Sequence, residues 1–222
     1  KIHPFTFFET RAMCPSFSSE EQAILYGITG GIPEYISRIS SKLTLDENIV
    51  ELFFTESGRL YEEPSNLLKQ ELRDPSTYNS VIGAIAGGAS KMNEIATKAG
   101  IETGAASNLL QALIELGIVR KEVPITEKES SRKTIYLLED QMFRFWYRFV
   151  SPNISGIVRG IGSIIYEKQV KPQLNHYMGL VFEEICRQYL YLPQIIAEAP
   201  FIYSKSGRWW GNNPVEKRQE EI

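Results

Sequence analysis

The sequence predicts a mainly helical α+β chain, in which a bundle of helices precedes a winged helix-turn-helix and a partial α/β region follows it. Two observations carry this prediction. Residues 74–138 hold three amphipathic helical patterns and then two short β patterns around a charged turn, the order of elements in a winged helix-turn-helix. Elsewhere most apolar residues recur at helical spacing, and β-like patterns occur only near the two ends.

The first 72 residues are expected to contain the end of a strand and then a small helical unit. Phe5–Phe8 resemble a strand that leads into a loop. Ser18–Glu21 matches a capping box, which opens a helix by satisfying its first N–H groups. Pro33 suits the first turn of a further helix, because proline has no N–H to donate there. Two more helical patterns complete a unit over residues 14–72.

The winged module spans residues 73–140, and each of its three helices has a start and a stop signal. The expected first residues or caps are Asp74, Ser90 and Thr103, and the expected stops are Gly87, Gly100 and Gly117. Glycine suits a helix end because it adopts the left-handed conformation without a Cβ clash. The two strands of the wing are expected at residues 118–122 and 134–138.

Residues 141–222 begin with an aromatic run that is too apolar for a free linker. Residues 142–150 hold five aromatic side chains, so we expect them to dock the winged module against the next region. Pro152 is expected to end this run, and Pro172 to start a long helix after one at about residues 157–170. The predicted core face of the long helix is Met178, Val181, Phe182, Ile185 and Tyr189. Residues 201–203 and 207–210 are β-like.

Composition excludes some classes of protein and leaves others open. The net charge of −3 gives no global attraction to nucleic acid, so binding to phosphate requires a local patch. The two cysteines and two histidines lack the spacing of a zinc site or a disulfide framework, and we expect no metal. No apolar run is long enough to cross a bilayer. We therefore expect a cytoplasmic protein without a membrane partner.

The third helix of the winged module is the candidate reader of DNA, because a recognition helix presents polar residues to base edges in the major groove. The predicted contacts are Thr103, Ser107, Asn108 and Gln111 on this helix, and Lys128, Arg132 and Lys133 in the wing. The helix has no Lys or Arg, and acidic residues lie among the wing cations. The module is therefore either a DNA reader or a surface for protein contact.

Nucleotide hydrolysis by this chain alone is not expected. None of its glycines is followed by lysine, so the phosphate-binding loop G-x-x-x-x-G-K-[ST] is absent. Glu139 and Asp140 follow an apolar strand, as magnesium-binding acids do in many ATPases. We interpret them instead as acids at the start of the next helix, where they complement its dipole.

A set of motifs in a fixed order indicates a family. The motifs are Gly30–Tyr35, Leu72–Ser76, Asn93–Ala96, Phe143–Phe149 and Gly207–Trp210. Together they resemble the archaeal and bacterial P-loop ATPases of AAA+/STAND type that carry a winged helix and a C-terminal restriction-endonuclease-like domain. The resemblance covers essentially the whole chain.

The resemblance implies an ATP-binding parent protein whose nucleotide core lies upstream. Residues 1–13 would end that P-loop core, residues 14–72 would form its helical lid, and residues 141–222 would form linker helices and the start of the nuclease-like domain. In this family the turn that matches Gly31, Ile32 and Pro33 lies against adenine. The parent would require ATP and magnesium, and this chain alone would hold neither.

The same resemblance makes Glu183 the counterpart of the helical glutamate in the nuclease-like site. Carboxylates suit such a site because divalent cations prefer oxygen ligands. The aspartate and lysine that complete the family's site are absent from the sequence. Glu183 is therefore either one part of an incomplete nuclease-like site or a residue of a solvated helix face.

Three functions follow as alternatives. In the first, ATP closes the lid on the upstream core, and the winged helix passes the change to DNA or to a protein partner. In the second, the chain is a winged-helix transcriptional regulator without enzymatic activity. In the third, it is an interaction module with a degenerate nuclease-like fold.

Overall fold

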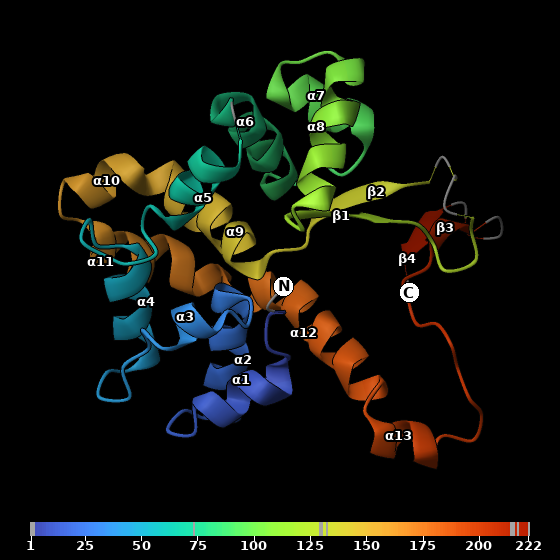
Figure 1. The fold of residues 1–222 in the computed structure, drawn as a ribbon, viewed down its shortest axis with the longest axis horizontal. Helices are drawn as coiled ribbons and strands as arrows, with labels where there is room; N and C mark the ends of the chain where they lie inside the picture. Colours follow the sequence, from blue (N-terminus) through green and yellow to red (C-terminus); the bar gives the residue numbers. More distant parts are fainter. Residues whose placement is uncertain are drawn as a thin grey trace.

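Helices dominate the structure, a computed structural model that describes residues 3–72, 74–128, 131, 133–213, 216 and 218–221 (Figure 1). The N-terminal helices and the long helix α12 (Leu174–Leu190) form one bundle, and the winged module lies beside it. The described residues form two separate two-stranded sheets, β1–β2 and β3–β4. The predicted fold class, mainly helical with a winged helix-turn-helix, is confirmed.

Capping boxes start three of the N-terminal helices. They precede α1 (Phe7–Met13), α2 (Ser19–Thr29) and α4 (Leu45–Phe53). At the first of them, the Glu9 carboxylate accepts from the Thr6 N–H at 2.8 Å. This local bonding makes Phe7 and Phe8 helical, so the strand expected at Phe5–Phe8 is wrong. The capping box expected at Ser18–Glu21 is confirmed.

The turn between α2 and α3 (Pro33–Ile36) fixes the start of the chain against the bundle. Gly30 and Gly31 have φ angles of 63° and 72°, which favour glycine. The Phe5 N–H donates to the Gly31 carbonyl at 2.8 Å. A Cβ at Gly31 would lie 2.1 Å from the Phe5 carbonyl oxygen. The turn thus holds Phe5 in direct backbone contact.

The winged module consists of three helices and an antiparallel hairpin, as predicted. After α5 (Glu63–Glu71), the helices are α6 (Pro75–Ala86), α7 (Met92–Ala99) and α8 (Thr103–Glu115), and the strands are β1 (Val119–Glu122) and β2 (Ile135–Leu138). Val119 pairs with Leu138, and Glu122 with Ile135. Gly100 and Gly117 have positive φ at the ends of α7 and α8.

Helix starts in this module differ slightly from the predicted ones. Asp74 is the N-cap of α6, as expected, and its carboxylate accepts from the Ser76 and Thr77 hydroxyls. Lys91 and Glu102, not Ser90 and Thr103, are the N-caps of α7 and α8. Glu94 explains the first shift, because its carboxylate accepts from the Ser90 and Lys91 N–H groups at 3.2 Å.

Two prolines expected to bound helices lie inside longer helical segments. One segment runs through α9 (Gln141–Phe145), a π-turn over Trp146–Val150, a 3₁₀ turn over Ser151–Asn153 and α10 (Ile154–Val158). The other runs through α11 (Gly162–Ile165), a π-turn over Tyr166–Val170, a 3₁₀ turn over Lys171–Gln173 and α12. Each π-turn precedes a proline and accommodates its missing N–H. The chain turns sharply between the two segments at Gly160, whose φ is 77°.

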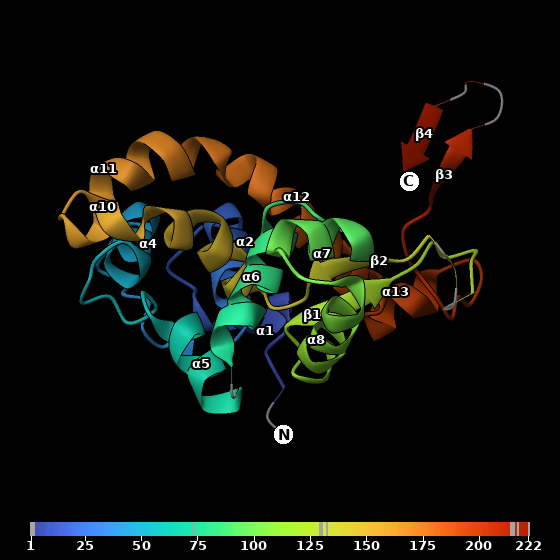
Figure 2. The same ribbon diagram turned by 90° about the horizontal axis from the view of Figure 1, so that it is seen from above.

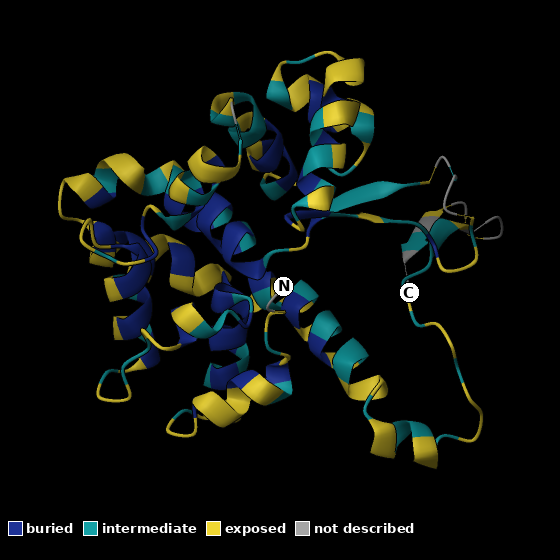
Figure 3. Ribbon diagram, viewed as in Figure 1, coloured by how far each residue is buried: buried dark blue, intermediate teal, exposed yellow. Residues whose placement is uncertain are grey.

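The aromatic run forms the centre of the molecule (Figure 3). Phe145 packs edge to face on Phe53 of α4 and on Tyr177 of α12. The Trp146 indole N–H donates to the Tyr61 carbonyl at 2.6 Å. The side chains of Phe143, Phe145, Trp146 and Phe149 are buried. The Tyr147 hydroxyl also donates to the Asn79 side chain of α6. The run thus contacts both the winged module and α12, as the prediction that it docks that module against the next region requires.

The C-terminal region carries a short helix that follows α12 and a hairpin that follows that helix (Figure 1 and Figure 2). It comprises α13 (Pro193–Glu198), β3 (Trp210–Asn213) and β4 (Arg218–Glu221). Residues 201–203 are not a strand, because they make no ladder with another segment among the described residues. On α12, Val181 and Ile185 are buried as predicted, but Phe182 is 64% exposed and Tyr189 is 49% exposed.

Candidate nucleic-acid interface

The outer face of α8 is polar and accessible. Thr103, Ser107, Asn108 and Gln111 are all exposed, and their spacing places them on neighbouring turns of one helix. Ala106, Leu110 and Leu113 on the opposite face are buried. The Gln111 amide donates to the Glu115 carboxylate at 3.0 Å, so part of this face is already hydrogen-bonded. The structure thus brings the four predicted reader residues together.

The wing presents few cations to a phosphate backbone. Lys128 is exposed. Lys133 is also exposed, but its ammonium lies 2.6 Å from the Glu127 carboxylate. Arg132, the third predicted wing contact, lies outside the described residues. Residues 73–140 contain eight Lys/Arg and nine Asp/Glu, a net charge of −1. The electrostatic attraction between this module and the phosphates of a duplex would therefore be weak.

A network of charged side chains connects the base of the wing to α12. Glu122 of β1 is its centre: only 13% of its side chain is exposed, and it meets Arg120 at 3.3 Å, Arg187 at 3.4 Å and Arg208 at 4.0 Å. Arg120 also pairs with Glu139 at 2.9 Å. Arg120 therefore stabilises the base of the wing through these ion pairs and does not form part of an open phosphate-binding surface.

Glu183 belongs to this network. Its carboxylate pairs with Arg187 one turn along α12 and lies 3.6 Å from Arg208. In the part of the chain that the structure describes, no group of three His, Cys, Asp or Glu side chains is arranged as a metal site. Glu184 lies 3.8 Å from Arg187. The catalytic role of Glu183 stays a prediction, and its observed contacts are those of an ion pair between α12 and the C-terminal region.

The glycine-proline turn borders a small polar cavity of about 230 Å³. Ile32 lines this cavity, whereas Gly31 is covered by Phe5 and Pro33 begins α3. The cavity also receives Arg120, Glu139, Asp140 and Glu184. Three carboxylates against one guanidinium do not fit a triphosphate. The residues present therefore do not fit a complete ATP molecule.

Asp140 caps α9 at the edge of that cavity, as predicted for a helix-start acid. Its carboxylate accepts from the Phe143 N–H at 2.9 Å. Burial raises the pKa of Asp140 above the usual value for a carboxyl group, and this N–H bond only partly offsets the effect. The neighbouring Glu139 does not cap the helix, and its carboxylate pairs with Arg120.

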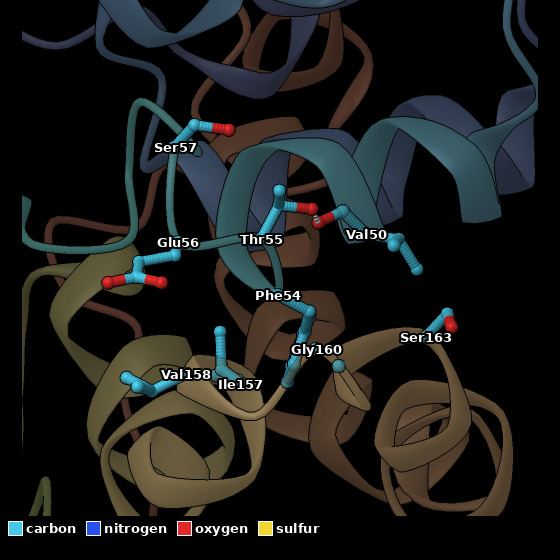
Figure 4. Close-up of a pocket in the computed structure, with 10 residues that line it drawn as sticks. Val50, Phe54, Thr55, Glu56, Ser57, Ile157, Val158, Gly160 and Ser163 are labelled. Atoms are coloured by element: carbon cyan, nitrogen blue, oxygen red, sulfur yellow. Dashed lines mark hydrogen bonds between the residues drawn. The ribbon is translucent and has the colours of Figure 1, made fainter.

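A larger cavity of about 640 Å³ lies between the end of α4 and the α10–α11 turn (Figure 4). Val50, Phe54 and Val158 give it apolar walls, and Glu56 is the one charged side chain among the described residues that line it. A Cβ at Gly162 would lie 1.8 Å from the Phe54 carbonyl oxygen, which shows how closely the two elements approach. With no cationic side chain among these lining residues, the cavity does not suit a phosphate.

The charged network and the close contact at Gly31 were not identified from the sequence. Three residues of the network, Glu122, Arg187 and Arg208, are far apart in the chain. The sequence around each of them is typical of a surface helix or of a strand. The available signal was the pair Arg120 and Glu122, whose opposite charges lie two residues apart and therefore on one face of β1.

Among the described residues, no helix has the length and apolar character needed to cross a membrane.

Comparison with known proteins identifies the class of two segments. Residues 80–123 match the IclR helix-turn-helix domain, which agrees with α6, α7 and α8 and with the start of the wing. Residues 146–222 match the DUF234 family, described as archaeal and bacterial proteins of unknown function. The chain thus combines segments similar to an IclR-type helix-turn-helix and to DUF234, as in a prokaryotic winged-helix protein.

The particular relative found is an uncharacterized protein of Methanocaldococcus jannaschii. It is 32% identical over 212 residues, which cover 95% of this chain and 47% of the relative. The chain therefore spans about half the length of the curated relative it matches. No solved structure gives a significant match.

Proposed function

We propose that this chain is the DNA-binding part of a longer prokaryotic protein and that α8 is its reading helix. The observation that carries this proposal is the exposed polar face of α8, with Asn108 and Gln111 directed away from the buried side. Asn and Gln pair with adenine through two hydrogen bonds in the major groove. The similarity of residues 80–123 to a helix-turn-helix domain supports the same role.

The wing would contribute phosphate contacts through Lys128 and Lys133. With two such contacts the affinity for DNA should depend only weakly on salt, with a slope of about −2 in log K against log salt concentration. Lys133 would exchange its bond to Glu127 for a phosphate. Because the module is weakly acidic overall, base contacts by α8 must carry much of the discrimination.

Duplex binding by the whole chain tests this proposal. Random-sequence duplexes would be enriched for binding, and the affinity of the selected site measured by fluorescence anisotropy. Asn108→Ala with Gln111→Ala should weaken binding about tenfold or more and relax the preference for adenine. Asn66→Ala with Gln70→Ala is the matched control, because both residues are exposed on α5. Failure to enrich any duplex, or an equal effect of both pairs, would contradict the proposal.

The finer part of the proposal is that the parent protein is a P-loop ATPase whose nucleotide state controls this module. The ordered motifs from Gly30–Tyr35 to Gly207–Trp210 support it, and Ile32 of the first of these motifs lines a cavity. Magnesium and the triphosphate would be held by the upstream core. Calorimetry with ATP and magnesium on the full-length protein tests this part, and the absence of binding would refute it.

The contacts of Glu183 favour a degenerate nuclease-like region over an active one. A carboxylate held by two arginines is poorly placed to ligate a cation as well. A longer protein that includes the residues after 222 should therefore show no metal-dependent cleavage of DNA. Cleavage that is lost on Glu183→Ala would overturn this part of the proposal.

A further inference from the structure

A second cavity, of about 570 Å³, lies between the winged module and the C-terminal hairpin. Its walls come from the α6–α7 turn, from β2, from Leu180 of α12, and from β3 and β4. Its volume falls within the range of small-ligand sites. No described residue of α8 lines it, so it is distinct from the duplex-reading face.

Cations outnumber acids around this cavity, unlike in the other cavities described. Lys91, Lys133 and Arg208 line it, against the single acid Glu220 among the described lining residues. Lys91 and Lys133 are exposed, and Lys133 also pairs with Glu127. Three cations against one lining acid suit a ligand that carries a phosphate, which would replace Glu127 as the partner of Lys133 and compete with Glu183 for Arg208.

An aromatic platform stands beside these cations. The half-buried Trp210 lines the cavity, with the Arg208 guanidinium 5.9 Å from its ring centroid. Arg208 is held in turn by Glu183 at 3.6 Å, and its carbonyl accepts from the Ile125 N–H of the wing at 2.9 Å. These contacts attach the chain just before Trp210 to α12 and to the wing. An aromatic side chain beside cations is the arrangement on which unpaired bases stack.

We propose that this cavity binds one phosphorylated nucleoside, with its base against Trp210 and its phosphate against Lys91 and Lys133. The ligand is a nucleotide of a single strand or a free nucleotide, since both carry this chemistry. The Asn212 side chain, which also lines the cavity, is available to hydrogen-bond the base edge. The site goes beyond the proposed duplex contact by α8, although Lys133 belongs to both.

Tryptophan fluorescence of the whole chain tests the site. The probes are the single-stranded oligonucleotide (dT)12, free thymidine monophosphate and inorganic phosphate, each at low salt. The oligonucleotide should quench the emission and bind measurably, and quenching should be absent with inorganic phosphate. Stronger binding of (dT)12 identifies the single strand as the ligand, and equal or stronger binding of the mononucleotide identifies the free nucleotide. Absence of binding by both would overturn the proposal.

Variants then locate the site. Trp210→Ala should weaken binding at least about fivefold, which is the low end for loss of a stacked base. Lys91→Gln should also weaken binding, and this exposed residue can be changed without disturbing the hairpin. Trp209→Phe is the matched control, because Trp209 does not line the cavity. Binding unchanged by both Trp210→Ala and Lys91→Gln would overturn the proposal.

The α8 variants separate this proposal from the duplex proposal. Asn108→Ala with Gln111→Ala should leave the affinity for (dT)12 unchanged while it weakens duplex binding. If the α8 pair weakens both ligands equally and Trp210→Ala weakens neither, all binding occurs at α8 and the cavity site is refuted. If duplex binding fails but oligonucleotide binding depends on Trp210, only the α8 proposal is refuted.

Discussion

The Tyr177 hydroxyl lies 2.6 Å from the carbonyl oxygen of Gly27. It also lies 3.0 Å from the Gln141 carbonyl oxygen. One side chain of α12 thereby connects the end of α2 with the start of α9, although the three segments are far apart in sequence. A Cβ at Gly27 would be 2.9 Å from Val181, so α2 and α12 pack closely at this point. The helical bundle and the C-terminal region thus share one core.

Replacing Tyr177 by phenylalanine should destabilise the whole chain. The change removes a buried hydroxyl and leaves the two carbonyl groups with one partner fewer, which should cost about 1–2 kcal/mol. Urea denaturation followed by circular dichroism measures the loss. Tyr189→Phe on the same helix is the control, because Tyr189 is exposed and should give almost no change. Equal effects would show that the Tyr177 hydroxyl contributes nothing.

Alanine at Gly31 should be among the most damaging small substitutions. Its Cβ would meet the Phe5 carbonyl oxygen, and its φ of 72° would be strained as well. Together these effects should cost about 3 kcal/mol. Gly88→Ala separates the two, because Gly88 has a φ of 92° but open space around it. Gly88→Ala should lower the free energy of unfolding by only about 1 kcal/mol. Equal losses for the two variants in thermal unfolding would argue against the close contact at Gly31.

Glutamine at Glu122 should loosen the wing. The change removes the negative charge that faces Arg120, Arg187 and Arg208, which should cost about 2 kcal/mol. Because salt screens part of this attraction, the difference from the unmodified chain should shrink at high salt. Hydrogen exchange should show faster opening of β1 and β2. Glu51→Gln, at an exposed site on α4, is the control, and a similar loss there would indicate a nonspecific effect of charge.

Replacing Asp140 by asparagine should make the chain more stable than the unmodified chain, and this advantage should grow as the pH rises. Because burial raises the folded-state pKa of Asp140, the folded chain holds this proton more tightly than the unfolded chain does. Stability is therefore lost from about pH 4, the unfolded pKa, upward to the raised folded pKa. The Asp140→Asn variant keeps a side chain that can cap α9, and it has no such loss.

Denaturation at a series of pH values measures this difference between Asp140→Asn and the unmodified chain. Asp74→Asn should show the opposite trend, because hydrogen bonds from Thr77 and Ser76 lower the pKa of Asp74. The stability that Asp74 contributes is present above its unfolded pKa and is lost as the pH falls. If the advantage of Asp140→Asn were constant with pH, Asp140 would not be the titrating group.

The winged module could be predicted in detail because local signals define it. Glycines at 100 and 117 end helices at the expected places, and the apolar spacing of α8 identifies its buried face correctly. The exposed reader residues follow from the same periodicity. The helix caps at Lys91 and Glu102 differ by one residue from the prediction. At α7 the cause is the Glu94 carboxylate, which accepts from the Ser90 and Lys91 N–H groups.

The remaining differences arise from contacts between distant segments. Phe182 has helical core spacing but is exposed, although Val181 and Ile185 on either side of it are buried, so the packed face of α12 is narrower than the spacing indicates. The Glu122 network requires three segments to meet, and no local pattern encodes that meeting. The cavity at Trp210 depends likewise on the hairpin's position beside the wing. Nor does the sequence alone place Glu183 between two arginines.

The π-turns before Pro152 and Pro172 change the direction that later side chains face. Each inserts one additional residue into the helical repeat, which advances the following residues by about 100° around the axis. Phe145, before the first insertion, packs on Phe53 and Tyr177. After the insertion, Gly156 faces Ile165 of the next helical segment. One continuous segment therefore serves two different sets of neighbours, and a straight helix of the same composition would satisfy only one of them.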